Sequence, residues 1–158
     1  MRFNELDHIG PTRKGLILED ETYTRVGDAM EVYYKLSSGF PEPVYQGALA
    51  LEFLLRGIPF EAQKELRTEY KGHILKKSYF ADFLCFEKII VEIKSLTHQT
   101  RADWSQIINR LKVSNLKVGL LFNFGNAVKL EQKRKEKNKK LAKEERGRQI
   151  QVSKYRGK

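Results

Sequence analysis

The chain has 158 residues, enough for one domain with an extension and a real hydrophobic core. A single cysteine, Cys85, excludes an intramolecular disulfide and a cysteine-built zinc or iron–sulfur site. No apolar run approaches the roughly 20 residues of a membrane span, and the N-terminal MRFNELDHIGPTRKG lacks the apolar stretch of a signal peptide. We therefore expect a cytoplasmic protein that makes no membrane contact.

The net charge of +10 is unevenly distributed. Residues 129–158 contain 13 Lys/Arg against 4 Asp/Glu, whereas the preceding part of the chain is nearly neutral. Such a polybasic segment is typical of a solvated or disordered tail, and sometimes of an arm that binds nucleic acid. Both alternatives stay open for this tail, which we expect to be helical or disordered and to pack little against the body.

Two helices are predicted after a loose leader over residues 1–17. The first helix, over residues 20–37, carries apolar residues at helical spacing: Tyr23, Val26, Met30 and Tyr33. The second helix begins at Pro41-Glu42-Pro43 and ends before Gly57. It is apolar nearly all round, so we expect neighbours to bury it on both sides.

Three strands, a helix and a last strand follow. The expected ranges are 60–70, 77–86 and 88–95 for the strands, 101–114 for the helix and 117–124 for the last strand, which is apolar on both faces. A strand, a helix and a strand in this order favour a right-handed parallel crossover. The predicted fold is an α/β domain over residues 18–128, of order α-α-β-β-β-α-β, with a mixed central sheet.

The hairpin SYFADFLCFEKIIVEIK, residues 78–94, contains charged residues where apolar ones would pack better. Side chains alternate along a strand, so Glu92 and Lys94 share a face. A two-residue loop would pair Asp82 with Ile93, whereas a three-residue loop from Phe86 to Lys88 would pair Asp82 with Glu92. The second register brings two carboxylates together, which a divalent metal ion could bridge. Alternatively, both carboxylates are half-exposed and Lys94 neutralises one of them.

Asp82 and Glu92-Ile93-Lys94 resemble the PD-(D/E)xK signature, with Ala81 in place of the proline. Upstream, GFPEPVY at residues 39–45 fits the pattern G-x-x-E-x-x-Y, and VGLLFNFG at residues 118–125 resembles a closing strand. Over about residues 20–126 the chain resembles the small bacterial GxxExxY family of PD-(D/E)xK nuclease-like proteins. The resemblance implies a restriction-endonuclease-like core.

The resemblance also implies a Mg²⁺- or Mn²⁺-dependent nuclease acting on DNA. Asp82 and Glu92 would be metal ligands, and Lys94 would lie beside the attacking water or the scissile phosphate. Glu42 would be the third, helix-borne ligand, or else a favourable acidic residue in a first helical turn. Glu52 lies about 15 Å further along the same helix and is expected at the surface. The competing expectation is a non-catalytic nucleic-acid-binding or protein-interaction domain on the same fold.

Further residues have two possible roles each. Tyr45 either orients Glu42 by a hydrogen bond or only packs. Similar families carry Q-x-x-x-Y on the helix where this chain has Gln106 and Arg110, so arginine replaces the tyrosine. Arg110 could contact phosphate or be an ordinary exposed arginine. In a helical tail, one side could lie along a phosphate backbone through Lys133, Lys137 and Lys140.

Overall fold

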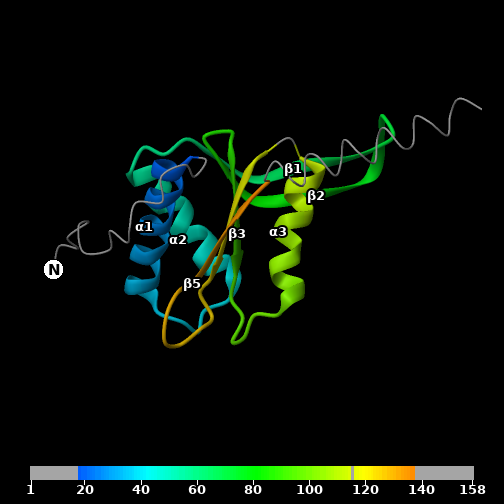
Figure 1. The fold of residues 1–158 in the computed structure, drawn as a ribbon. Helices are drawn as coiled ribbons and strands as arrows, with labels where there is room; N and C mark the ends of the chain where they lie inside the picture. The colour runs from blue at the N-terminus through cyan, green and yellow to red at the C-terminus, as the bar shows by residue number, and fades with distance from the viewer. Residues whose placement is uncertain (1–17, 115, 138–158) are drawn as a thin grey trace, which may run out of the picture.

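The structure is a computed structural model that describes residues 18–114 and 116–137. Its elements are α1 Glu19–Leu36, α2 Glu42–Leu55, β1 Phe60–Tyr70, β2 His73–Cys85, β3 Ile89–Lys94, α3 Arg101–Val113, β4 Val118–Asn123 and β5 Glu131–Glu136. The strands form one five-stranded sheet in the order β1-β2-β3-β4-β5. Helices α1 and α2 cover one face of the sheet and α3 covers the other (Figure 1).

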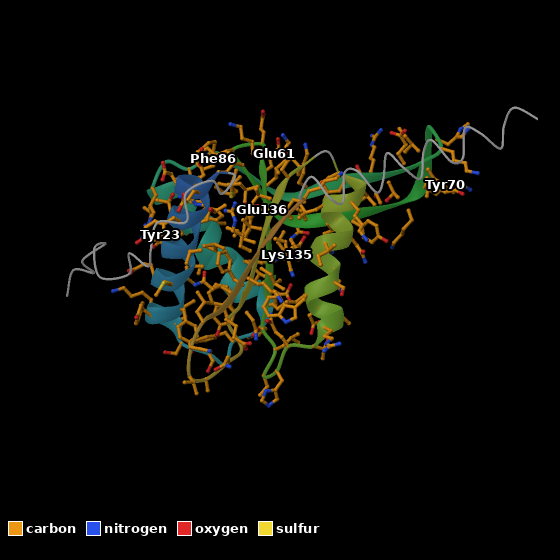
Figure 2. The ribbon with its side chains drawn as sticks, in the orientation of Figure 1. Tyr23, Glu61, Tyr70, Phe86, Lys135 and Glu136 are labelled. Atoms are coloured by element: carbon orange, nitrogen blue, oxygen red, sulfur yellow. The ribbon has the colours of Figure 1, made fainter. Side chains whose placement is uncertain are left out.

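The sheet is mixed, as predicted. Neighbouring strands are antiparallel except for β3 and β4, which are parallel and joined through α3. The expected order α-α-β-β-β-α-β is therefore confirmed, with β5 added at its end. Beyond the sheet, β1 and β2 continue together as a two-stranded ribbon with Tyr70 near its tip (Figures 1 and 2).

The β2–β3 hairpin adopts the register of the three-residue loop. The backbone pairing runs from Phe83 with Val91 to Cys85 with Ile89, so Phe86 to Lys88 form the connection. Phe86 and Glu87 have φ angles of 53° and 56°, in the left-handed region that turns the chain. Continuing this register places Asp82 opposite Glu92.

Two clusters of apolar side chains lie on the two faces of the sheet. Because side chains alternate along a strand, Phe83 and Val91 pack toward α1 and α2, whereas Leu84 and Ile90 pack toward α3. On α3, Ile107 and Leu111 supply the buried contacts, whereas Trp104 is only half-buried. The hairpin is thus anchored from both faces.

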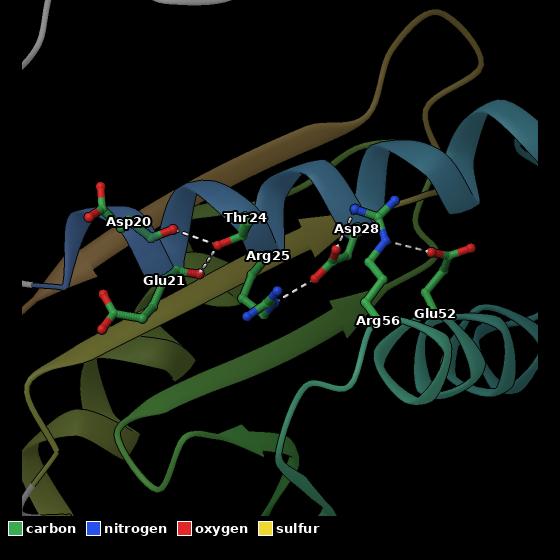
Figure 3. Close-up of polar contacts among 7 residues, drawn as sticks. All are labelled: Asp20, Glu21, Thr24, Arg25, Asp28, Glu52 and Arg56. Atoms are coloured by element: carbon green, nitrogen blue, oxygen red, sulfur yellow. Dashed lines mark hydrogen bonds and ion pairs between the residues drawn. The ribbon is translucent and has the colours of Figure 1, made fainter. Parts of the chain in front are cut away.

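The buried face of α1 differs from the expected one. Tyr23 is 48% exposed, while Arg25 and Asp28 are buried and form an ion pair (Figure 3). The Arg25 guanidinium also lies 5.6 Å from the ring centroid of Phe53 and 5.3 Å from that of Phe86. A buried charge needs such partners, and the spacing of apolar residues cannot reveal them.

Helix α2 is not buried on both sides as expected. Its sheet-facing residues Tyr45, Leu49 and Phe53 are fully buried, whereas Leu54 and Leu55 are 67% and 73% exposed. An apolar composition therefore overstated how much of this helix its neighbours cover. Within the two described ranges, no helix is long and apolar enough to cross a membrane.

The expectation of a helical or disordered tail from residue 129 is wrong for its first part. Glu131–Glu136 form β5, which pairs antiparallel with β4 along its whole length. The charged sequence EQKRKE lacks apolar alternation, but an edge strand needs only backbone partners on one side. Residues 138–158 lie outside the described residues.

Side-chain hydrogen bonds join the segment after β3 to the end of β4. Asn123 is buried; its Nδ2 donates to the carbonyl of Leu96 and its Oδ1 accepts from the Leu96 N–H, each at 2.8 Å. The backbone N–H of Phe124 donates to the carbonyl of Lys94 at 2.9 Å. Gly125 lies against Leu96 so closely that a Cβ atom there would be 2.4 Å from its backbone.

We predict that Gly125→Ala lowers the free energy of unfolding by about 1–3 kcal/mol, because two backbone segments must separate to admit one methyl group. Urea unfolding measures the change. Gly27→Ala in α1 is the control, because an added Cβ there meets nothing within 4 Å and should raise stability by up to about 1 kcal/mol. Equal stabilisation by both substitutions would contradict the close approach at Leu96.

Candidate active site

The candidate site lies where β2 separates from β3. Backbone pairing between these strands ends at Phe83 and Val91, while β2 continues beside β1. Just past this point, Oδ2 of Asp82 accepts a hydrogen bond from the backbone N–H of Ile93 at 2.7 Å. Bonds to an ionised acceptor are stronger than neutral ones. The Asp82 carboxylate therefore replaces a backbone acceptor and fixes the fork between the two strands.

Glu92 is the buried acid of the fork. It is 4% exposed, and burial raises its pKa to about 8. The negative charge of Asp82 adds to this shift, whereas Arg110 and Lys94 oppose it. Without a further positive charge, this carboxyl group retains its proton near neutral pH.

Glu42 approaches the fork from the first turn of α2. Burial raises the pKa of Glu42, the charge of Asp82 acts in the same direction and Lys94 opposes it. Glu52 points elsewhere: its carboxylate accepts from Nε of Arg56 at 2.9 Å, beside Asp28 (Figure 3). Of the two α2 glutamates, Glu42 is the one whose charge interacts with Asp82.

Lys94 lies among several carboxyl groups at the end of β3. Its positive charge lowers the pKa values of Glu42, Glu92 and Asp103, although other causes outweigh it at the first two. The next residue, Ser95, donates its hydroxyl to the carbonyl of Phe40 at 2.7 Å. This bond joins the end of β3 to the loop that precedes Glu42.

Sequence reasoning missed Gln46, which contacts Asp82 directly. Its Nε2 donates to Oδ1 of Asp82 at 2.7 Å, and Nε2 of Gln63 lies 3.5 Å from the same oxygen. Gln46 follows Glu42 by four residues and therefore shares its helix face, a signal that was available. Gln63 gives no such signal, because it sits in β1 with an irregular φ of 50°.

Tyr45 does not orient Glu42 by the hydrogen bond considered above. Its buried hydroxyl donates to the carbonyl of Ser37 and accepts from the N–H of Phe40 at 3.2 Å. Its ring stacks on Phe124 with a centroid distance of 4.6 Å. Tyr45 is a packing residue that fixes the loop leading into α2.

The two helix residues Gln106 and Arg110 are placed differently. Gln106 is exposed on α3, and its supporting role stays a prediction. Arg110 is mostly buried, with Nη1 3.2 Å from Oε1 of Glu92 and its guanidinium 5.9 Å from the ring centroid of Tyr79. The arginine expected at phosphate thus contacts a carboxyl group of the fork.

Lys133 and Lys137, two of the three tail lysines named above, do not lie on a helix. Lys133 lies in β5 with Nζ 4.7 Å from the ring centroid of Trp104 on α3, and Lys137 donates its backbone N–H to Lys117. Lys140 lies outside the described residues. The pairing of β5 with β4 overrides the helical spacing.

The residues at the fork suit a hard divalent cation. Mg²⁺ binds proteins through one or two carboxylates and keeps water and substrate phosphates as its other ligands. Oε1 of Glu92 makes no hydrogen bond within the described part of the chain, despite the nearby Arg110. No group of three or more Asp, Glu, His or Cys that could hold a metal occurs among residues 18–114 and 116–137. The arrangement therefore fits an open two-carboxylate site rather than a closed cage.

We predict that the metal-free protein loses stability as pH rises from about 4.5 to about 8. Folded Glu92 keeps a proton that the unfolded chain releases in this window, so raising the pH favours unfolding, with a slope approaching about 1.4 kcal/mol per pH unit. Urea unfolding in EDTA across this range measures the slope. Glu92→Gln should flatten it, whereas Glu61→Gln, at an exposed glutamate, should not. An unaltered slope in Glu92→Gln would mean that Glu92 is ionised in the fold.

Comparison with known proteins identifies the family. Residues 19–135 match the PD-(D/E)XK nuclease superfamily. No curated protein matches the chain. A solved structure titled "Crystal structure of SSO0001" is 18% identical with a TM-score of 0.46; the match covers 60% of this chain and half of the other, and is too weak to support an argument. The family match spans every helix and nearly every strand residue described above, so the chain belongs to the PD-(D/E)XK nuclease superfamily.

Proposed function

We propose that the protein is a metal-dependent nuclease that hydrolyses phosphodiester bonds in DNA. The supporting observation is the fork between β2 and β3, where Asp82 is fixed by a backbone N–H and faces the buried Glu92, with Lys94 two residues on. Membership of the superfamily supports nuclease chemistry in general terms.

Asp82 and Glu92 would hold Mg²⁺ or Mn²⁺. Glu42, whose charge interacts with that of Asp82, would join them as a third ligand only once the ion is bound. When bound, the ion polarises a phosphoryl oxygen and lowers the pKa of a water molecule. Gln46 and the Ile93 N–H keep Asp82 in one orientation. The Lys94 ammonium group offsets the negative charge that develops at the phosphate.

The motif that contains Glu42 supports assignment to the GxxExxY branch of the superfamily. The hydroxyl of Tyr45 is hydrogen-bonded within this motif and to the end of α1, which gives the tyrosine a structural role. A cytoplasmic location is part of the proposal, because a lone, buried cysteine suits a reducing compartment.

One observation favours the second candidate, a non-catalytic domain that binds nucleic acid or protein. The Arg110 guanidinium lies 3.2 Å from Glu92 and supplies positive charge where a metal would. If that ion pair is permanent, the fork needs no cation, and the fold serves binding alone. The variants below separate the two candidates.

We predict that Mg²⁺ or Mn²⁺ raises the melting temperature, by an amount that grows with the logarithm of the ion concentration over its Kd, because the ion binds the folded state. Asp82→Asn and Glu92→Gln should abolish this rise, and Glu42→Gln should weaken it. Glu52→Gln, on the same helix and with the same charge change, is the matched control and should keep the rise. If Glu52→Gln weakens it as much as Glu42→Gln does, Glu42 is not a ligand.

We predict that Lys94→Ala keeps the metal-dependent rise in melting temperature but slows cleavage of a labelled DNA by about 10²–10³-fold. Cleavage is measured with Mg²⁺, with Mn²⁺ and with chelator. Arg110→Ala should retain metal-dependent cleavage if Arg110 only neutralises Glu92 in the metal-free protein. No cleavage of DNA or RNA by the unmodified protein, together with no metal-dependent rise, would favour the non-catalytic alternative.

A further inference from the structure

The ribbon formed by the outer parts of β1 and β2, residues 64–80, has no part in the core beyond Leu66 (Figure 1). Every residue from Glu69 to Lys77 is exposed. A β-bulge interrupts the pairing: three residues of β2, 75–77, lie opposite Thr68 of β1. Bulges of this kind twist a ribbon and redirect its side chains. From residue 69 to residue 77 the ribbon is therefore an arm with solvent on both faces.

The ribbon carries five Lys/Arg against two Glu. Lys64 is paired with Glu61, and Lys71 lies over the Tyr70 ring. The remaining three cations have no ion-pair partner among the described residues: Arg67 on β1, and Lys76 and Lys77 in the bulge of β2. Unpaired cations on both strands of an arm suit a ligand with two rows of negative charge.

Apolar side chains lie on both faces of the ribbon near its tip. Tyr70 is 60% exposed, Ile74 64% and Leu75 43%. Tyr70 pairs with His73 and Glu69 with Ile74, so Tyr70 and Ile74 point to opposite faces. A flat partner would cover only one of these faces. A groove that surrounds the ribbon would cover both.

The ribbon is also continuous with the candidate active site. Asp82 follows Lys77 by five positions in β2, a distance of about 17 Å along the strand. That distance corresponds to about five base pairs of B-form DNA. At the base of the ribbon, Tyr79 lies beside Arg110, which itself contacts Glu92.

Resting on the proposed function, we propose that this ribbon enters the major groove of B-form DNA beside the cleaved phosphodiester bond, with Arg67, Lys76 and Lys77 contacting phosphates. The major groove of B-DNA, about 12 Å wide, admits a two-stranded β-ribbon. The major groove of A-form RNA is too deep and narrow for side chains to enter. The ligand is therefore duplex DNA.

The test compares two triple variants that lose the same charge. The ribbon variant combines Arg67→Gln, Lys76→Gln and Lys77→Gln. The control variant changes exposed lysines elsewhere in the fold: Lys35→Gln, Lys88→Gln and Lys117→Gln. Binding of a fluorescent duplex of about 20 base pairs, two turns of B-DNA, is measured by anisotropy in EDTA over a range of salt concentrations.

We expect the ribbon variant to bind the duplex about tenfold more weakly or worse, with a slope of log affinity against log salt reduced by about 2.7, or 0.9 for each lost contact. The control variant should change the slope by less than about 0.9, the value for one phosphate contact. Equal losses in both variants, or no loss in either, would overturn the proposal.

Other ligands test the groove itself. The difference between the two variants should disappear with single-stranded DNA of the same sequence and with duplex RNA; an equal difference with either would overturn binding in a B-form groove. Analytical ultracentrifugation without DNA tests the alternative that the ribbon binds a second copy of the chain. A dimer that only the ribbon variant dissociates would overturn the proposal in favour of self-association.

The outcomes also separate this inference from the nuclease activity. Ribbon-dependent binding without metal-dependent cleavage would leave the ribbon as a DNA-binding arm and contradict the nuclease. Cleavage and duplex binding that the ribbon variant leaves unchanged would contradict the ribbon alone. Both measurements use the full chain.

Discussion

The hydrogen bond from the Ile93 N–H to the Asp82 carboxylate is the contact on which the site depends. At this point β2 stops pairing with β3 and turns outward with β1, which leaves a strand donor without a backbone acceptor. An unpaired buried N–H would cost about 1–3 kcal/mol. Because a carboxylate fills the gap, one residue both closes the ladder and stands beside Glu92. The two strands can then diverge without loss of register.

Around this contact the protein gathers acidic groups whose charged forms burial disfavours. Glu92 is enclosed, Glu42 is half-enclosed, and both have raised pKa values because water is excluded and Asp82 is negative. Arg110 and Lys94 compensate only in part. Local arrangements that lower stability persist where function requires them. Burial of the apolar clusters on both faces of the sheet offsets the destabilisation that such a site causes.

Much of the fold was predictable because periodicity reports burial directly. Side-chain alternation and chain order predicted the range of β1 and the parallel crossover. Turn length limited the hairpin to two registers, and the structure adopts one of them. Several of the failures share one cause. Arg25 with Asp28, Gln46 with Asp82, and Arg110 with Glu92 are polar contacts between residues chosen for their partners, not for hydrophobicity. Likewise β5 forms because β4 offers a backbone edge, which no property of EQKRKE discloses.

That edge has a consequence for the solution behaviour of shortened chains. Strand β4, VGLLFN, is buried throughout, with β3 on one side and β5 on the other. A chain ending at residue 128 would lose β5 and leave a row of unpaired N–H and C=O groups along a short, apolar strand. Such an edge is a template for pairing between molecules. The charged β5 therefore covers this edge, and its lysines and arginine disfavour the addition of a further strand to the sheet.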